Sequence, residues 1–240
     1  LAAAVRRNVV DERLELLAPR VSSLTVVDVE SAALASWWHL EGSEAGQSAI
    51  LLDVGALRTA LVGMNEGRIA HLRSLPLGGN SIARLLSEEM NIDMESAERA
   101  VYSGDAETVP ACSAFCDELH REVTATLNML RFRGVLSEVS TRVYIAGGCA
   151  ASRIFREEMG RRFVRVLHNP AAPREQAFQF AEMAKEQWNG SLMSQALALA
   201  LREAGKTGGF NFVRGRRSTE GIVQKIREEL PWIGPVAAAI

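Results

Sequence analysis

The chain has 240 residues, of which 48% are hydrophobic and 23% charged, and its formal net charge is −2. These values are ordinary for a globular protein and exclude disorder, collagen and coiled coil as the dominant state, and no run of 18 apolar residues offers a complete membrane span. Residues 1–120 carry 9 arginines against 18 Asp and Glu, whereas basic residues predominate in 121–240. This imbalance argues against a nucleic-acid partner and allows an anionic ligand or membrane surface near the second half.

The N-terminal part is expected to be mainly helical. Residues 3–18 are amphipathic and predict a helix, Ser23–Val29 is β-branched and predicts a short strand, and Ser31–Leu40 predicts a second helix. The polar segment 41–47 is a predicted linker. Because the chain begins at Leu1 and ends in an apolar decapeptide, we expect both ends to be cuts in a longer protein.

A β pattern follows and then gives way to helices. We expect strands at 49–54, 59–64 and 68–77, helices from Gly78 to Met90, from Asp93 and from Pro110 to Arg133, a strand at 142–146, a helix at about 151–163, a strand at 164–167 and helices within 174–201. Three adjacent strands followed by strands interleaved with helices describe a mixed sheet flanked by helices. This is the ribonuclease-H-like α/β unit, which actin-like ATPases use twice.

Six motifs, each weak alone, resemble one family when taken in order. Leu51–Thr59 is similar to the second phosphate motif of actin-like ATPases, and Arg142–Ala150 is similar to their adenosine motif. The PilM proteins of type IV pili have segments similar to three further motifs, Val26–Leu34, Ser74–Ile82 and Leu197–Arg202. The sixth motif, Phe210–Gly215, resembles the tail that precedes the membrane helix in the GspL proteins of type II secretion.

The resemblance implies a domain arrangement. Family members usually begin with about a hundred further residues that carry the first phosphate loop. We therefore expect residues 1–45 to be the end of the first actin-like lobe, 46–205 to be a complete second lobe, and 206–240 to be a basic juxtamembrane tail cut at the start of a membrane span. The tail carries 6 Lys and Arg against 3 Glu, which suits the cytoplasmic side of a membrane.

The resemblance also implies a nucleotide site. In the turn after residue 54, backbone N–H groups would face the β- and γ-phosphates of ATP, and Asp53 would contact Mg²⁺. Gly55 permits close approach of the phosphates, and Ala56, Arg58 and Thr59 complete the turn. The alternative is an ordinary hairpin with a capping aspartate.

The second half of the expected nucleotide site follows the strand at 142–146. Gly147, Gly148 and Cys149 lie between this strand and a helix, where unpaired N–H groups would meet the adenosine. The alternative is a tight turn that needs glycine for packing. Gly78-Gly79-Asn80 could be a second place where the backbone approaches the ligand, but we favour the interpretation that these residues simply begin the following helix.

Other reactive residues form no recognisable constellation. Cys112 and Cys116 are four residues apart on one helix, and with no further ligand at metal spacing we expect them to pack in the core. No Ser-His-Asp or Cys-His pairing is visible, and no catalytic residue is assigned.

The expected function is therefore assembly. We interpret the chain as a scaffold on the cytoplasmic face of the inner membrane that links a secretion or pilus ATPase to the membrane platform proteins, with ATP and Mg²⁺ bound structurally and at most weak ATPase activity. The basic tail favours a GspL-type membrane protein over PilM, and the resemblance allows self-association. The alternatives are a sugar- or acetate-kinase-like phosphotransferase and a filament-forming actin-like ATPase.

Overall fold

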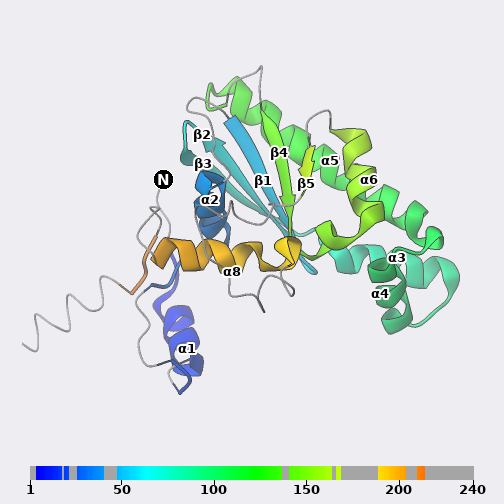
Figure 1. Cartoon of the computed structure of the whole chain (residues 1–240), viewed down its shortest axis with the longest axis horizontal. Helices are drawn as coiled ribbons and strands as arrows, with labels where there is room; N and C mark the ends of the chain where they lie inside the picture. Colours follow the sequence, from blue (N-terminus) through cyan, green and yellow to red (C-terminus); the bar gives the residue numbers. More distant parts are fainter. Residues whose placement is uncertain are drawn as a thin grey trace, which may run out of the picture. The chain divides into compact units, whose positions relative to one another are not determined.

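The structure is a computed structural model, shown in Figure 1. It describes residues 4–17, 19–21, 26–40, 48–136, 141–163, 166–168, 189–203 and 210–213. These residues belong to two compact units, one covering residues 30–208 and the other joining residues 2–29 to 209–240. Each unit is considered by itself.

The larger unit is built on a five-stranded sheet with the order β3-β2-β1-β4-β5 (Figure 1). The pairs β1–β2 and β2–β3 are antiparallel, whereas β1–β4 and β4–β5 are parallel. The strands are β1 (Ser48–Val54), β2 (Thr59–Asn65), β3 (Arg68–Leu75), β4 (Arg142–Ala146) and β5 (Val166–His168). The mixed sheet predicted from the order of the elements is confirmed.

Local sequence explains the meander, which is formed by the consecutive antiparallel strands β1, β2 and β3. All seven residues of β1 are buried, because this strand lies in the middle of the sheet with helices on both faces. The β2–β3 turn has two consecutive residues at positive φ, Glu66 at 49° and Gly67 at 75°. That backbone twist matches the twist of a two-stranded ribbon, so the Asn-Glu-Gly segment closes the hairpin as the sequence predicts.

The helices follow the predicted order. Asp93 caps α4 by accepting a 2.9 Å hydrogen bond from the N–H of Ser96. Gly134 lies just beyond the end of α5 with a positive φ of 66°. Among the described residues, the helices of this unit are α2 (Glu30–Leu40), α3 (Gly79–Met90), α4 (Met94–Ser103), α5 (Val109–Phe132), α6 (Arg153–Arg162) and α8 (Gly190–Glu203), with short 3₁₀ turns η1 (Ala106–Thr108) and η2 (Gly148–Ala151).

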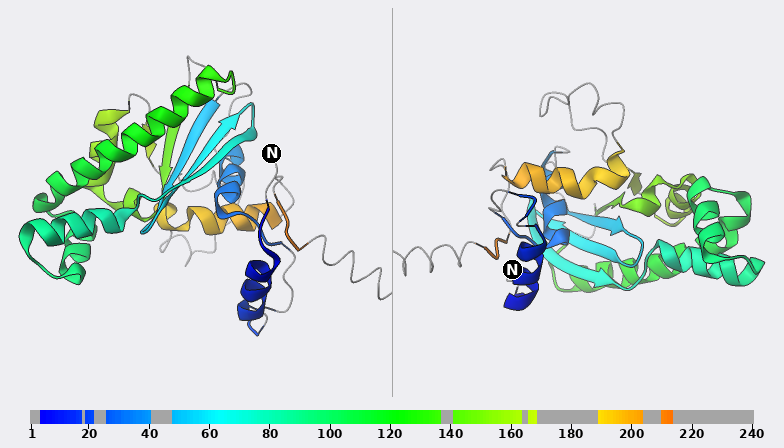
Figure 2. Two further views of the ribbon diagram at one scale, coloured as in Figure 1. Left: turned by 180° about the vertical axis from the view of Figure 1, so that it is seen from behind. Right: turned by 90° about the horizontal axis from the view of Figure 1, so that it is seen from below.

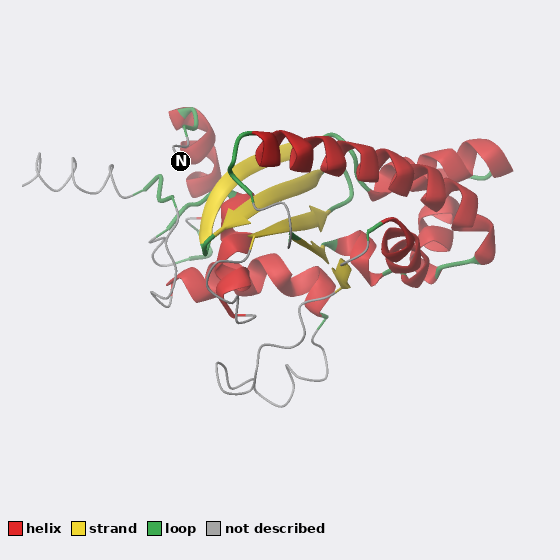
Figure 3. Ribbon diagram, turned by 90° about the horizontal axis from the view of Figure 1, so that it is seen from above, coloured by secondary structure: helices red, strands yellow, loops and turns green. Residues whose placement is uncertain are grey.

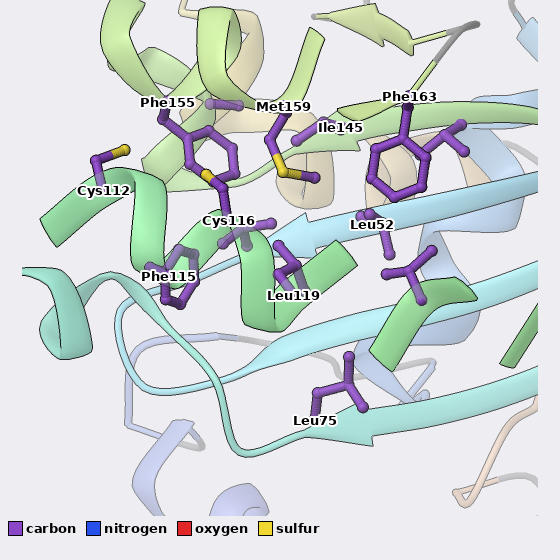
Figure 4. Packing of buried hydrophobic residues seen from close by; sticks show 14 of the residues in the cluster. Leu52, Leu75, Cys112, Phe115, Cys116, Leu119, Ile145, Phe155, Met159 and Phe163 are labelled. Atoms are coloured by element: carbon purple, nitrogen blue, oxygen red, sulfur yellow. The ribbon is translucent and has the colours of Figure 1, made fainter. Parts of the chain in front are cut away.

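Helices cover both faces of the sheet, as Figures 2 and 3 show for the long helix α5 on one face. On that face α3, α5 and α6 enclose the larger core, part of which is drawn in Figure 4. Its members include Leu52, Phe115, Cys116, Phe155 and Met159, and each of these residues is at most 2% exposed. The opposite face carries α2 and α8 over a smaller core around Trp38 and Tyr144, whose rings meet edge to face at 4.8 Å.

The smaller unit contains α1 (Arg7–Leu17) and two short segments far apart in sequence. The N–H of Phe212 donates to the carbonyl of Val27 at 2.9 Å, and the N–H of Phe210 donates to Oδ1 of Asp28 at 3.2 Å. The prediction of a strand over Ser23–Val29 is wrong for its described part, because residues 26–29 lack the repeated backbone pairing of a ladder. The first residues of one recognised motif, 26–29, and the described part of another, 210–213, nevertheless meet here.

Several sequence expectations fall outside the described residues. These are the linker at 41–47, the helical pattern over 174–188 and the tail beyond residue 213. Within the described part of the chain, no helix is both long and apolar enough to cross a membrane.

Candidate functional site

The turn between β1 and β2 is tied to the start of α3. The N–H of Gly55 donates to the carbonyl of Arg58 at 3.0 Å, which closes the turn. The carbonyls of Gly55 and Ala56 each accept a 2.9 Å hydrogen bond, from the N–H groups of Gly79 and Asn80 respectively. The turn is therefore held rigidly against the first turn of the helix.

Two glycines allow the loops to approach this closely. A Cβ atom at Gly78 would lie 2.4 Å from the carbonyl oxygen of Ala56. At Gly147, which has a φ of 92°, a Cβ atom would lie 2.2 Å from Oδ1 of Asp53 and 2.6 Å from the backbone of Val54. Any side chain at either position would force these segments apart.

A pocket of about 300 Å³ opens where these segments meet. The β1–β2 turn contributes Gly55 and Ala56, and the segment after β4 contributes Gly148, Cys149 and Ser152. The remaining wall comes from three helices, through Gly79, Asn80 and Ala83 of α3, Glu98, Val101 and Tyr102 of α4, and Leu192 of α8. Backbone at glycines on one side and an exposed aromatic ring on the other can receive a ligand with a polar end and a planar apolar end.

Asp53 lies at the end of β1 next to this pocket but does not line it. Its side chain is buried, and Oδ2 accepts a hydrogen bond from the amide of Gln195 on α8. Burial raises the pKa of Asp53 from 3.8 to about 6, with a further upward contribution from the negative charge of Glu30, and the hydrogen bond from Gln195 opposes both. The negative charge of Glu30 therefore adds to the effect of burial in disfavouring the ionised form of Asp53.

The two carboxylates have the chemistry of a Mg²⁺ site, since this ion prefers oxygen ligands and would relieve their repulsion. Among the described residues, no group of three or more His, Cys, Asp and Glu side chains could by itself hold a metal ion. Mg²⁺ commonly binds through one or two carboxylates together with water and phosphate oxygens, and since neither Asp53 nor Glu30 lines the pocket, a bound Mg²⁺ would depend chiefly on water and phosphate ligands.

The structure brings together half of the predicted site residues at the pocket. Gly55, Ala56, Gly148 and Cys149 line it. The other four, Asp53, Arg58, Thr59 and Gly147, are not in its wall. Gly147 instead packs on Asp53, Arg58 is exposed, and the hydroxyl of Thr59 donates to the carbonyl of Leu77 at 2.7 Å. The assignment of all eight to a nucleotide site stays a prediction.

Sequence reasoning misses the contributions of three helices. The sequence favours the interpretation that Gly78-Gly79-Asn80 only begins a helix, yet Gly79 and Asn80 also line the pocket. The wall from α4 has the spacing i, i+3, i+4 at Glu98, Val101 and Tyr102, which in sequence is no different from an ordinary helix face. Gln195 is 142 residues from Asp53 in the chain, so no local pattern pairs them.

The cysteine beside the pocket is not poised for reaction. Burial raises the pKa of Cys149 to about 12, so the thiol stays protonated at neutral pH. Its sulfur would lie 2.7 Å from a Cβ atom at Gly79, so it fills the space between two of the loops. Cys112 and Cys116 are buried in the larger core, as expected.

A family model described as "Type IV pilus assembly protein PilM" matches residues 1–203. The chain belongs to the PilM family. A solved structure described as "PilM-PilN type IV pilus biogenesis complex" is 25% identical, with a TM-score of 0.64 over 82% of this chain and 58% of that one. This chain thus spans little more than half the length of that relative.

More distant solved structures share the fold. MreB5 of Spiroplasma citri bound to AMPPNP is 16% identical, with a TM-score of 0.59 over 85% of this chain and 66% of that one. The ethanolamine utilization protein EutJ from Carboxydothermus hydrogenoformans is 21% identical, with a TM-score of 0.52 over 72% of this chain and 53% of that one. These neighbours establish the actin-like fold that the sequence predicts.

Proposed function

We propose that this chain is part of a type IV pilus assembly scaffold whose actin-like domain binds ATP and Mg²⁺ without significant turnover. The observation that carries the proposal is the family match over residues 1–203 together with a pocket where three glycine-containing segments meet at the ends of the central strands. A crevice at the carboxyl ends of parallel strands is the usual ligand site of an α/β sheet.

The pocket suits the nucleoside half of ATP. The ring of Tyr102, which is 71% exposed, offers a stacking surface for the base, and the carboxylate of Glu98 one turn earlier on α4 can accept from ribose hydroxyls. Gly148 lets the ligand approach the start of η2, and the β1–β2 turn lies on the side where phosphates would extend. Bound Mg²⁺ would neutralise phosphate charge beside Asp53 and Glu30.

The domain assignment belongs to the same proposal. Residues 46–205 would form the second actin-like lobe and residues 1–45 the end of the first, although the compact unit begins at Glu30. The pairing of residues 27 and 212 supports a return of the chain from the second lobe to the first.

The partners follow from the family. The solved relative is a complex of PilM with PilN, so we infer a PilN-type inner-membrane platform protein as partner, with the domain on the cytoplasmic face. Coupling to the pilus ATPase is the further step of this proposal. The GspL alternative rests on the basic tail, of which only residues 210–213 are described, and the family match supports the pilus machine instead.

Calorimetry tests the nucleotide part. The Tyr102→Ala variant should bind Mg-ATP about tenfold or more weakly than the unmodified chain, because aromatic stacking of a base contributes about 1–3 kcal/mol. Phe132→Ala is the matched control, since Phe132 is also an exposed aromatic (94%) but does not line the pocket. Equal loss in both variants, or no binding to the unmodified chain, would refute the nucleotide assignment.

The scaffold part has its own test. The chain should co-elute in size-exclusion chromatography with the cytoplasmic segment of the PilN-type protein from the same organism. Separate elution at concentrations of tens of micromolar, about the range of a transient interface, would count against it.

A further inference from the structure

The sheet has a second end, opposite the pocket, where three strands begin. Strands β1, β3 and β4 run in the same direction, because β4 is parallel to β1 whereas β2 is antiparallel to both β1 and β3. Helix α5 runs from the α3–α4 pair to this opposite end (Figure 2). Its last turn packs on β2 there, since a Cβ atom at Gly63 would lie 3.3 Å from Cδ1 of Leu130.

Four arginines gather at this end, and their charges are not neutralised. Arg68 begins β3 and Arg142 begins β4, while Arg131 and Arg133 flank Phe132, the last residue of α5. In the part of the chain that the structure describes, none of the four side chains forms an ion pair. We call these four arginines and Phe132 the basic end.

The local excess of positive charge can be counted. The described segments at this end are 48–50, 64–70, 130–136 and 141–143. Against the four arginines they contain one carboxylate, that of Glu66 in the β2–β3 turn, so their net charge is 4 − 1 = +3. The half-buried His71 on β3 reports the same field, because burial lowers its pKa and the charges of Arg73 and Arg133 lower it further. A surface with such a potential attracts anions.

Phe132 makes this surface apolar as well as basic. It is 94% exposed, the highest fraction among the exposed large hydrophobic residues that the structure describes. Its ring therefore protrudes from the end of α5 between two guanidinium groups. A bilayer interface accepts a protruding ring at the boundary of headgroups and acyl chains while arginines meet the phosphates. A protein partner would instead need a matching pocket for the ring.

The other end of the same unit carries the opposite charge. Residues 79–108, which contain α3 and α4, have seven Asp and Glu against two Arg. The 24 residues of α5 separate the two ends by about 36 Å, several times the Debye length of about 8–10 Å, so the acidic end does not screen the basic one. Such a charge dipole would orient the unit on an anionic surface with the pocket facing away from it.

We propose that the basic end is a contact site for an anionic phospholipid surface, with the ring of Phe132 entering the interface and the four arginines meeting lipid phosphates. The inference rests on the proposed function in one respect, the place of the domain at the inner membrane. It adds the face of the domain that meets the bilayer, and it leaves the pocket open to ligands from solution.

Sedimentation with sucrose-loaded vesicles measures this contact in the absence of nucleotide. The unmodified chain should bind vesicles of phosphatidylcholine with about one-third phosphatidylglycerol at least about tenfold more tightly than phosphatidylcholine alone, and added salt should weaken the binding. Phe132→Ala should weaken it about tenfold, because the ring no longer leaves water. Arg133→Gln should weaken it about fivefold. Both side chains are exposed, so neither variant removes a core contact.

Matched controls lie at the opposite end of the unit. Leu57→Ala removes an apolar side chain that is 72% exposed in the β1–β2 turn, and Arg84→Gln removes an exposed arginine of α3. Both variants should bind the vesicles like the unmodified chain. Residues 214–240 are present in every form, so a contribution from them is the same throughout.

Tryptophan quenching by brominated phosphatidylcholine locates the contact. Phe132→Trp should be quenched in anionic vesicles more than the unmodified chain, and Leu57→Trp should not. Absence of binding to the anionic vesicles would overturn the inference, as would binding that Phe132→Ala and Arg133→Gln leave unchanged. An equal loss in Arg84→Gln would also overturn it, because net charge alone would then explain the binding.

A protein partner at the basic end gives a different result. Phe132→Ala would then lose co-elution with the PilN-type segment and keep its vesicle binding, which would overturn the lipid assignment. Calorimetry with Mg-ATP and co-elution of the unmodified chain use no vesicles. Failure of the proposed function and failure of the lipid assignment are therefore distinguishable.

Discussion

The buried carboxylate of Asp53 makes a prediction about stability that can be worked out from its pKa. The pKa is about 6 in the folded protein against 3.8 for an unperturbed aspartate, chiefly because of burial. The folded state therefore holds this proton more tightly than the unfolded state. The resulting stability is fully present below about pH 4 and is lost as the pH rises through about 6.

The magnitude follows from the shift. Two pKa units correspond to about 3 kcal/mol, and Asp53 is nearly fully buried, so solvent screening reduces this little. Asparagine cannot ionise, yet it can accept the hydrogen bond from Gln195. Asp53→Asn should therefore gain about 2 kcal/mol in unfolding free energy relative to the unmodified chain when both are moved from about pH 4 to about pH 7.5.

Urea unfolding followed by circular dichroism at a series of pH values measures this difference. Asp117→Asn is the control of opposite sign, because the hydrogen bond and charge of Arg162 lower the pKa of Asp117. The unmodified chain should become more stable relative to the Asp117→Asn variant as the pH rises. A pH-independent difference for Asp53→Asn, or one that falls with rising pH, would refute the burial argument.

Three further predictions concern neighbouring residues. Glu30→Gln should lower the pKa of Asp53 by removing a negative charge, which moves the pH-dependent loss of stability to lower pH in the same urea series. Gly147→Ala should cost about 3 kcal/mol or more in thermal or urea unfolding, because the added Cβ meets Asp53 and the backbone is at positive φ. Glu158→Gln should cost about 2 kcal/mol, because the nearly buried Arg162 loses its charged partner 2.6 Å away on α6 and keeps only the exposed Asp117.

Matched controls accompany the last two. Gly148→Ala should be nearly neutral, since the nearest atom to its Cβ is Cδ2 of Leu192 at 3.9 Å. Glu157→Gln should cost about 0.5 kcal/mol or less, because its ion pair with Arg153 is exposed. Similar losses within either pair would show that the named contacts do not decide the effect.

The order of elements and the fold class are accessible from the sequence. The fully buried run of β1, the turn residues at 65–67 and the amphipathic face of α5 are local patterns, and each defines its element without knowledge of the rest. The strand predicted wrongly, at 23–29, lies where the described backbone has too few pairing partners to form a ladder. Propensity alone cannot supply those partners, because they come from residues 210–213.

The sequence by itself determined the meander, the glycine-containing turns after β1 and β4, and the family resemblance, because each is written in residues close together in the chain. Only the tertiary structure decided that α3 and α4 complete the pocket, that Gln195 meets Asp53, and that Glu30 raises the pKa of that carboxyl. Burial, hydrogen bonding and charge act through space across many residues of chain. The chemistry of Asp53 therefore exists only once α2 and α8 have packed against the sheet.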